Sequence, residues 1–183
     1  MMRNHPSYVR NLADSSDIQE HLGLLRGLAM QCEQVVELGF RTGVSTSAFL
    51  AAGVKVRSYD IEHYPCRPFV QTLAREYPDT FSFKVGDSRE VEIPECEMLF
   101  IDTDHTEATT LQELSRHNKY VSTWIVLHDT VSFGRKDRPP GKGAGVMSAI
   151  DTFLADPGDN WMQWLHLINN NGLTILQRHR ENE

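Results

Sequence analysis

The sequence lacks several features that would mark particular classes of protein. It has only three cysteines, and no C-x-x-C pair that could bind zinc or carry redox chemistry, so we expect Cys32, Cys66 and Cys96 to be free thiols, buried or without a role. No apolar run approaches the roughly 20 residues that span a bilayer, and residues 1–6 lack the apolar core of a signal peptide. These absences predict a cytoplasmic protein with no membrane partner.

A surplus of positive charge is also missing. The 183 residues include 18 Lys and Arg against 25 Asp and Glu, which gives a formal net charge of −7. Proteins that bind nucleic acid by neutralising phosphates usually carry a basic surplus, so we expect no nucleic-acid partner and a small-molecule substrate instead. A chain of this length with 40% hydrophobic residues is typical of one globular domain, here residues 1–183.

Short apolar runs alternate with helical patterns along the chain. After an N-terminal tail (1–16), a lead-in helix is predicted at 17–30. Strands are predicted at 34–38, 55–59, 81–85, 98–101 and 124–127. Helices are predicted at 44–52, 65–77 and 145–155, and one with Leu111 and Leu114 facing inward follows the fourth strand. The last two strands, 161–168 and 173–176, flank an Asn-Gly tip that favours a tight hairpin.

This alternation predicts the fold class. Strands that alternate with helices pair in parallel, so we expect a three-layer, Rossmann-like, doubly wound α/β fold. Its mostly parallel seven-stranded sheet should end in an antiparallel hairpin. Ligands of such sheets bind beyond the carboxyl ends of the strands. Polar residues end five consecutive predicted strands: Glu37, Asp60, Asp87, Asp102 and the pair His128-Asp129.

The turn after the first strand is rich in glycine. In the segment from Glu37 to Thr46, Gly39 and Gly43 allow a sharp turn and a close approach of the backbone to a ligand, while the following helix presents free N–H groups. The two glycines are four residues apart, so the dinucleotide pattern G-x-G-x-x-G is absent. Arg41, beside the turn, is expected to be a surface side chain.

This segment resembles motif I of the class I S-adenosylmethionine-dependent methyltransferases. The resemblance implies that the acid and the glycines wrap the amino acid end of the cofactor, and that Asp60 accepts hydrogen bonds from both ribose hydroxyls. It also implies that Gly86-Asp87-Ser88 contacts adenine. The cofactor-binding residues would then be Glu37, Gly39, Gly43, Ser45, Asp60, Asp87, Ser88 and Asp102.

Two further segments, Ile101 to His105 and Leu127 to Thr130, resemble a subgroup of small-molecule O-methyltransferases of the catechol and macrolide-sugar types. The resemblance implies that Asp102, His128 and Asp129 hold a divalent ion, usually magnesium. It also implies that His105 is the general base, with Asp102 beside it as the second catalytic residue. An unperturbed histidine pKa near 6.5 suits a base at neutral pH.

One difference from that subgroup is His128, where those enzymes have an oxygen ligand. Magnesium prefers oxygen ligands, whereas imidazole suits manganese, iron, cobalt or zinc. The expected ion, if one binds, is therefore either magnesium, which the resemblance implies, or manganese, which accepts a histidine ligand. The alternative is that His128 hydrogen-bonds a neighbouring loop and Asp129 orients it. For His105 the alternative is a structural role at the start of a helix.

The segment 132–144 is basic and rich in glycine and proline, and we expect a mobile loop, either a lid or an ordinary solvated loop. The usual substrate-cap domain is absent, so this loop or a second subunit of a homo-oligomer must cover the site. The predicted function is O-methylation of a small hydroxylated molecule, such as a sugar or a secondary metabolite. The alternatives are a non-catalytic protein that binds the nucleoside or serves assembly, and an NAD(P)-dependent oxidoreductase, which the glycine spacing disfavours.

Overall fold

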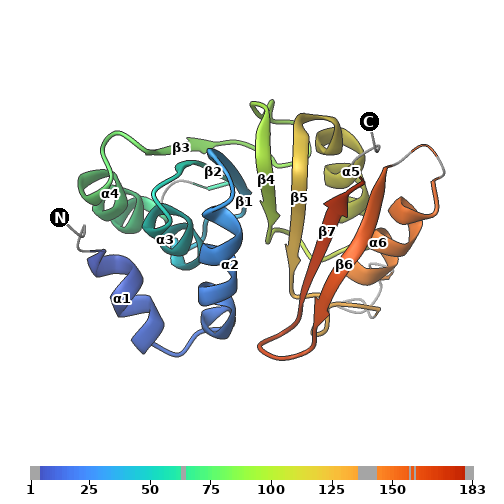
Figure 1. Ribbon diagram of the computed structural model, residues 1–183, viewed down its shortest axis with the longest axis horizontal. Helices are drawn as coiled ribbons and strands as arrows, with labels where there is room; N and C mark the ends of the chain where they lie inside the picture. Colours follow the sequence, from blue (N-terminus) through green and yellow to red (C-terminus); the bar gives the residue numbers. More distant parts are fainter. Residues whose placement is uncertain (1–4, 63–64, 136–143, 157, 159, 180–183) are drawn as a thin grey trace.

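The computed structural model describes residues 5–62, 65–135, 144–156, 158 and 160–179. Its centre is one seven-stranded sheet with the order β3-β2-β1-β4-β5-β7-β6 (Figure 1). The first five strands pair in parallel, and β7 is antiparallel to both β5 and β6. The strands are β1 (Gln34–Leu38), β2 (Lys55–Asp60), β3 (Phe81–Val85), β4 (Cys96–Ile101), β5 (Val121–His128), β6 (Trp161–Leu167) and β7 (Leu173–Arg178). The predicted fold class is confirmed.

Helices cover both faces of the sheet (Figure 1). One face carries α1 (Pro6–Ala13), α2 (Leu22–Ala29), α3 (Val44–Ala51) and α4 (Arg67–Glu76), and the other carries α5 (Glu107–His117) and α6 (Val146–Leu154). Short 3-10 helices, η1 (Gln19–His21) and η2 (Asn118–Tyr120), precede α2 and β5. The sheet is therefore the middle of three layers.

The central strands are apolar on both sides because each side faces a helical layer. Successive strand residues point to opposite faces, so Val35 and Phe100 pack on the α1–α4 side while Val36 and Leu99 pack on the α5–α6 side. All four side chains are buried. This double burial explains why residues 98–101 of β4 appear in the sequence as a continuous hydrophobic run, and why β1 carries two adjacent valines.

The N-terminal region differs from the prediction. Residues 6–13 of the expected tail form α1, which Pro6 starts at a position where its missing N–H costs nothing. Asn11 donates to the Ser47 hydroxyl of α3 at 3.0 Å, which holds α1 against the body. The single helix predicted at 17–30 is divided into η1 and α2, because its first residues bind the β6–β7 hairpin tip instead. Residues 136–143 of the predicted mobile loop lie outside the described residues.

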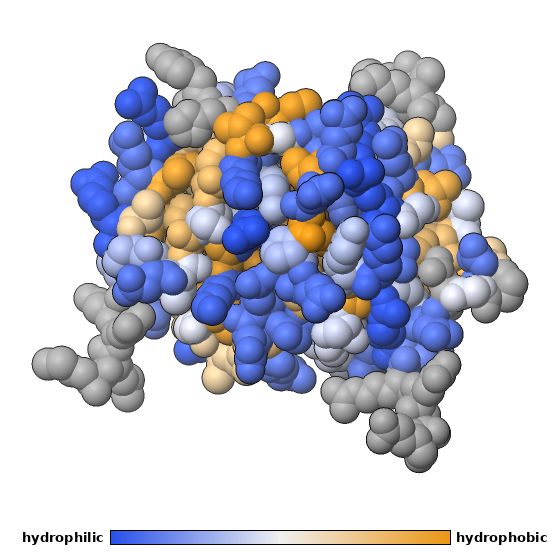
Figure 2. Space-filling model, turned by 90° about the horizontal axis from the view of Figure 1, so that it is seen from above, coloured by the Kyte–Doolittle hydropathy of each residue, from blue (hydrophilic) through white to orange (hydrophobic). Residues whose placement is uncertain are grey.

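The carboxyl ends of β1, β2 and β4 lie side by side, as a ligand site requires. The Gly39 amide donates to the Tyr59 carbonyl of β2, and the Asp102 amide donates to the Leu38 carbonyl of β1, both at 2.9 Å. Figure 2 looks onto the opposite end of the molecule, where β4 and β5 begin, and hydrophilic side chains predominate there. Within the described residues, no helix is both long enough and apolar enough to cross a membrane.

Candidate functional site

The turn between β1 and α3 depends on its glycines. Gly39, Arg41 and Gly43 have φ values of 91°, 48° and 72°, a left-handed region that favours glycine. A Cβ atom on Gly39 would lie 1.9 Å from the Asp102 carbonyl oxygen, so no other residue fits there without moving the end of β4. The turn is therefore packed directly against the strand that carries Asp102.

Glu37 lies beneath this turn and not in a cavity. Its carboxylate is fully buried and accepts hydrogen bonds from the hydroxyls of Ser45 and Thr46, both at 2.6 Å, and of Ser58. Burial outweighs these hydrogen bonds and raises the pKa of Glu37 to about 7. Glu37 and Ser45 thus hold α3 and β2 around the turn, and the direct cofactor contact expected for both stays a prediction.

A cavity of about 440 Å³ opens beyond the turn, at the ends of β1, β2, β3 and β4. We call it the nucleoside cavity, after the ligand that the sequence resemblance implies. Of the predicted cofactor-binding residues, five line it: Gly39, Asp60, Asp87, Ser88 and Asp102. Glu37, Gly43 and Ser45 do not. Arg41 is an exposed side chain, as expected, and it also borders the cavity. The rest of the lining is Tyr59, Ile61, Gly86, Arg89, Thr103, Asp104 and Thr109.

Asp60 joins β2 to the glycine turn. Its Oδ2 accepts the backbone amides of Phe40 and Arg41 at 3.1 and 2.8 Å, and its Oδ1 accepts the Glu62 amide at 3.3 Å. A carboxylate has about four acceptor positions, so Asp60 retains capacity for a further donor. It is therefore placed both to shape the turn and to receive a hydroxyl group from the cavity.

Asp87 is hydrogen-bonded to Arg89, two residues further along the chain. The Arg89 side chain contacts both Asp87 carboxylate oxygens, at 2.9 and 2.5 Å, and the Arg89 amide donates to Oδ1 at 2.9 Å. These hydrogen bonds lower the pKa of Asp87 to about 2. Asp87 therefore stays ionised over the physiological range, with its charge balanced by a cation at the cavity wall.

The predicted catalytic and metal-binding residues form one cluster beside this cavity. His105 Nε2 lies 3.2 Å from Asp102 Oδ1 and 2.9 Å from Asp129 Oδ2. His128 Nδ1 lies 3.5 Å from Asp102 Oδ1 and 3.7 Å from Asp129 Oδ2. The ring of Phe133 stacks on His105 with 4.4 Å between centroids, which fixes the plane of the imidazole.

The charges in this cluster change the expectation for His105. Burial lowers the pKa of His105, but its contacts with Asp102 and Asp129 outweigh burial and raise the pKa to about 9. Burial likewise opposes ionisation of Asp102, yet its contacts with His105 and His128 lower the pKa of that carboxyl. The unperturbed value near 6.5 therefore does not apply, and His105 is a cation at neutral pH in the ligand-free chain.

The position of His128 is set by the backbone around it. Its Nε2 lies 3.0 Å from the Asp17 carbonyl and 3.2 Å from the Asn170 carbonyl, so this nitrogen must be the donor. Nδ1 faces the two aspartates, and burial is outweighed by the contact with Asp102, which raises the pKa of His128. In neutral His128 the lone pair is on Nδ1, so an ion bound there would replace the Nδ1 proton. The hydrogen bonds to neighbouring loops, one of the two roles considered for His128, are therefore present and leave Nδ1 available as a ligand.

The donor set fits a divalent metal ion. Ligand atoms of Asp102, His128 and Asp129 all lie within 4.8 Å of one another. His128 Nδ1 and Asp129 Oδ1 are buried and have no hydrogen-bond partner among the described residues, and the two side chains are 0% and 6% exposed. Buried polar atoms normally have partners, so two orphaned ligand atoms beside a carboxylate indicate a place for a cation. One nitrogen and two oxygens suit manganese better than magnesium.

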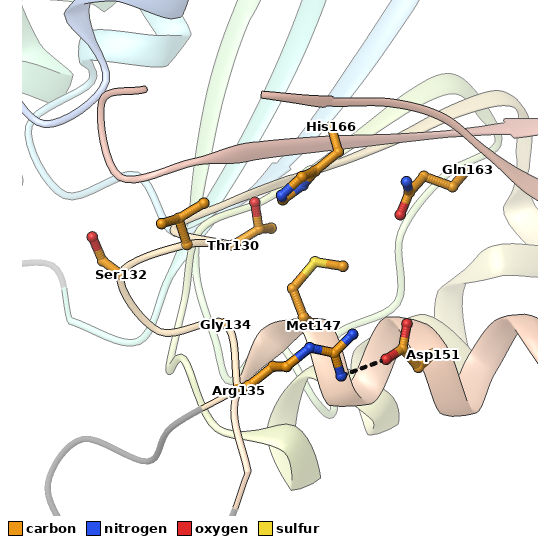
Figure 3. A pocket seen from close by; sticks show the side chains of 9 residues that line it. Thr130, Ser132, Gly134, Arg135, Met147, Asp151, Gln163 and His166 are labelled. Carbon is orange, nitrogen blue, oxygen red and sulfur yellow. Dashed lines mark ion pairs between the residues drawn. The ribbon is translucent and has the colours of Figure 1, made fainter. Parts of the chain in front are cut away.

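A second cavity, of about 730 Å³, lies between α6, β6 and the turn that follows β5 (Figure 3). Its polar lining includes Thr130, whose buried hydroxyl has no hydrogen-bond partner in the part of the chain that the structure describes, and His166, which is hydrogen-bonded to Thr174 at 2.8 Å. Arg135 and Asp151, also in the lining, form an ion pair at 2.8 Å and so balance each other's charge. The cavity is separated from His105 by the turn carrying Phe133.

Some residues of the site were not foreseen from the sequence. Asp17 and Asn170 hold His128 although they are 111 and 42 residues away from it. Asp17 also pairs with Arg41 through two hydrogen bonds, at 2.7 and 2.5 Å. No local pattern marks such long-range contacts, whereas the Asn-Gly hairpin tip, which was predicted, indirectly places Asn170.

Comparison with known proteins supports the class that the sheet order and the cavity define. A family model described as a methyltransferase domain matches residues 36–130, more than half of the chain. The chain belongs to this methyltransferase domain family. The match begins in β1 and ends just after His128-Asp129, so it includes every predicted site residue. A comparison with curated proteins gives no match.

Solved structures share the fold at low sequence identity. The O-methyltransferase of Bacillus cereus in complex with SAH has 16% identity and a TM-score of 0.68, covering 95% of this chain and 89% of that one. The O-methyltransferase TomG of Streptomyces achromogenes, solved with SAM, has 14% identity and a TM-score of 0.66, covering 95% and 88%. A protein of Corynebacterium glutamicum has 14% identity and a TM-score of 0.74, covering 97% and 91%. The predicted resemblance to the class I methyltransferases is confirmed at the level of fold and family.

Proposed function

We propose that this chain uses S-adenosylmethionine to methylate an oxygen atom of a small hydroxylated molecule, such as a sugar or a secondary metabolite, with a divalent ion at the acceptor. One observation carries the proposal. Asp102 belongs both to the nucleoside cavity and to the cluster of His105, His128 and Asp129. A cofactor site and a group of proton-transferring and metal-binding side chains therefore meet at one residue.

The lining of the nucleoside cavity supports the choice of cofactor. Asp60 has acceptor capacity for ribose hydroxyls, and Asp87 and Ser88 present polar groups at the next strand end. S-Adenosylmethionine supplies a methyl group on a positively charged sulfur. The lowered pKa of Asp102 keeps a carboxylate at the cavity wall, and a negative charge there attracts a cationic ligand. The structures solved with SAM and SAH that share this fold also favour this cofactor.

The acceptor oxygen needs orientation and must lose its proton. In the proposed arrangement, Asp129 and Asp102 orient the acceptor hydroxyl. His105 carries a proton in the ligand-free chain, and a bound cation that competes for the carboxylates of Asp102 and Asp129 would lower its pKa, so that neutral His105 can take the proton of the acceptor. Phe133 keeps the imidazole of His105 in place by stacking. A divalent ion held by Asp102, His128 and Asp129 would lower the pKa of the acceptor hydroxyl.

The charge of the chain and the proteins that share its fold support a small acceptor with a reactive oxygen. The net charge of −7 speaks against a polymeric nucleic-acid acceptor. Two of the proteins that share the fold are described as O-methyltransferases, which favours oxygen over nitrogen.

Calorimetry tests the cofactor. S-Adenosylmethionine and S-adenosylhomocysteine should each bind one to one, and NAD⁺ should not bind. Asp60→Ala should weaken the affinity at least tenfold, since hydrogen bonds to a charged group are worth about 1.5–3 kcal/mol. Asp79→Ala is the matched control, because Asp79 is an exposed acid outside the nucleoside cavity. Binding of NAD⁺ in place of S-adenosylmethionine would favour the oxidoreductase.

Turnover and metal binding are tested separately. Methyl transfer should be detected with a panel of catechols, phenols and hydroxylated sugars; cofactor binding without transfer to any of them would favour the non-catalytic alternative. Manganese should bind with micromolar or tighter affinity by calorimetry, and Asp129→Ala should abolish that binding while S-adenosylhomocysteine still binds. Manganese affinity equal in wild type and Asp129→Ala would exclude the proposed ion site.

A further inference from the structure

Two ionisable side chains on α5 are fully buried and have no part in the proposed methyl transfer. Glu113 and His117 are both 0% exposed. They are four residues apart, so they lie on the same face of the helix, which packs against the sheet. A leucine, Leu114, lies beside them on this face and is equally buried.

Each of these two side chains contacts a residue of the nucleoside cavity. The Thr103 hydroxyl donates to Glu113 Oε1 at 2.7 Å. His117 Nε2 donates to the Ser88 carbonyl at 2.7 Å. Thr103 follows β4 and Ser88 follows β3, and both line the cavity. One helix face therefore reaches two separate walls of the same site.

Burial of these groups is costly, which argues against a purely structural role. Burial raises the pKa of Glu113 to about 7 and lowers the pKa of His117. Both side chains are therefore harder to ionise in the folded chain than in water. Apolar side chains of similar volume pack between a helix and a sheet without this cost. The contacts instead provide directional hydrogen bonds to the residues that meet the ligand.

We propose that Glu113 and His117 are positioning residues that set the affinity for the adenosine part of the cofactor, by holding the Thr103 side chain and the Ser88 peptide in place. The inference rests on the proposed function, because it assumes that the cavity binds an adenosine-containing cofactor. Neither residue reaches the cluster of Asp102 and His105. Their effect should therefore appear in binding and not in the chemical step.

Calorimetry with two probes tests this inference. S-Adenosylhomocysteine and 5′-methylthioadenosine share the adenosine part, but only the first has the amino acid end. Glu113→Leu should weaken both affinities by about the same factor, on the order of tenfold, because it leaves the Thr103 hydroxyl without its acceptor. Glu113→Gln keeps an oxygen acceptor and should stay within about threefold of wild type. His117→Leu should weaken both probes, and His117→Gln, which keeps an N–H donor, should restore part of the loss.

Leu114→Val is the matched control, since it changes packing on the same helix without touching a polar group. It should lower the melting temperature and leave both affinities unchanged. If Glu113→Leu loses stability but binds both probes like wild type, the positioning role is wrong and the proposed function stands. A loss for S-adenosylhomocysteine alone would also overturn the role. If wild type binds neither probe, the proposed function fails, and this inference fails with it.

Discussion

Glu37→Gln should change how the stability of the chain depends on pH. The variant keeps the shape of the side chain but is neutral at every pH. In wild type, burial raises the pKa of Glu37 from 4.5 to about 7, so the folded state holds a proton that the unfolded state has released. The stability linked to this proton is complete below pH 4.5 and is lost as pH rises to about 7. Wild type should lose stability relative to the variant across this window.

The magnitude follows from the two pKa values. Each pKa unit is worth about 1.4 kcal/mol, so the free energy of unfolding of Glu37→Gln should gain about 3 kcal/mol relative to wild type between pH 4.5 and 7, and then level off. Urea denaturation of both proteins at several pH values measures this difference, and titration of distant groups cancels in it. If the difference in unfolding free energy between the two proteins does not change with pH, the hydroxyls of Ser45, Thr46 and Ser58 keep Glu37 ionised. That result would refute the conclusion that burial raises the pKa of Glu37.

Two further predictions concern the walls of the nucleoside cavity. Gly39→Ala should destabilise the chain by several kcal/mol in thermal unfolding, because its Cβ would meet the Asp102 carbonyl; Gly53→Ala, with a similar φ of 88° and open space around it, should cost only about 1 kcal/mol. If the two variants unfold alike, the close packing of the turn on β4 is wrong. For Asp87, NMR titration should give a pKa of about 2, and Arg89→Ala should move it up toward 3.8, since the arginine hydrogen bonds are the main cause of the low value; an unchanged midpoint would contradict this.

Much of the fold could be predicted because local patterns determine it. The strands of the sheet were placed to within a few residues by continuous or β-branched apolar runs, and the hairpin by its Asn-Gly tip, where Asn170, Asn171 and Gly172 all have positive φ. The N-terminal residues were assigned wrongly for a physical reason. The helix α1 has only eight residues, which is too short to be stable alone, and it is held by tertiary contacts such as that of Asn11 with Ser47.

The site was predicted in outline, because strand ends in a parallel sheet meet at one edge. This argument placed Asp60, Asp87 and Asp102 around one cavity and brought His128 and Asp129 to Asp102. It could not separate a residue that lines the cavity from one that lies beneath it, as Glu37 does, since that depends on side-chain packing. Nor could it give the charge on His105, because the pKa depends on two carboxylates that only the folded chain brings together.

The central claim is that the cavity beside Asp60 and Asp102 binds the methyl donor. A crystal structure of the chain with S-adenosylhomocysteine tests this most directly. The account predicts ribose hydroxyls on the Asp60 carboxylate, adenine beside Asp87 and Ser88, and the sulfur atom directed toward Asp102. A nucleoside bound at the other cavity, or with its ribose away from Asp60, would contradict it.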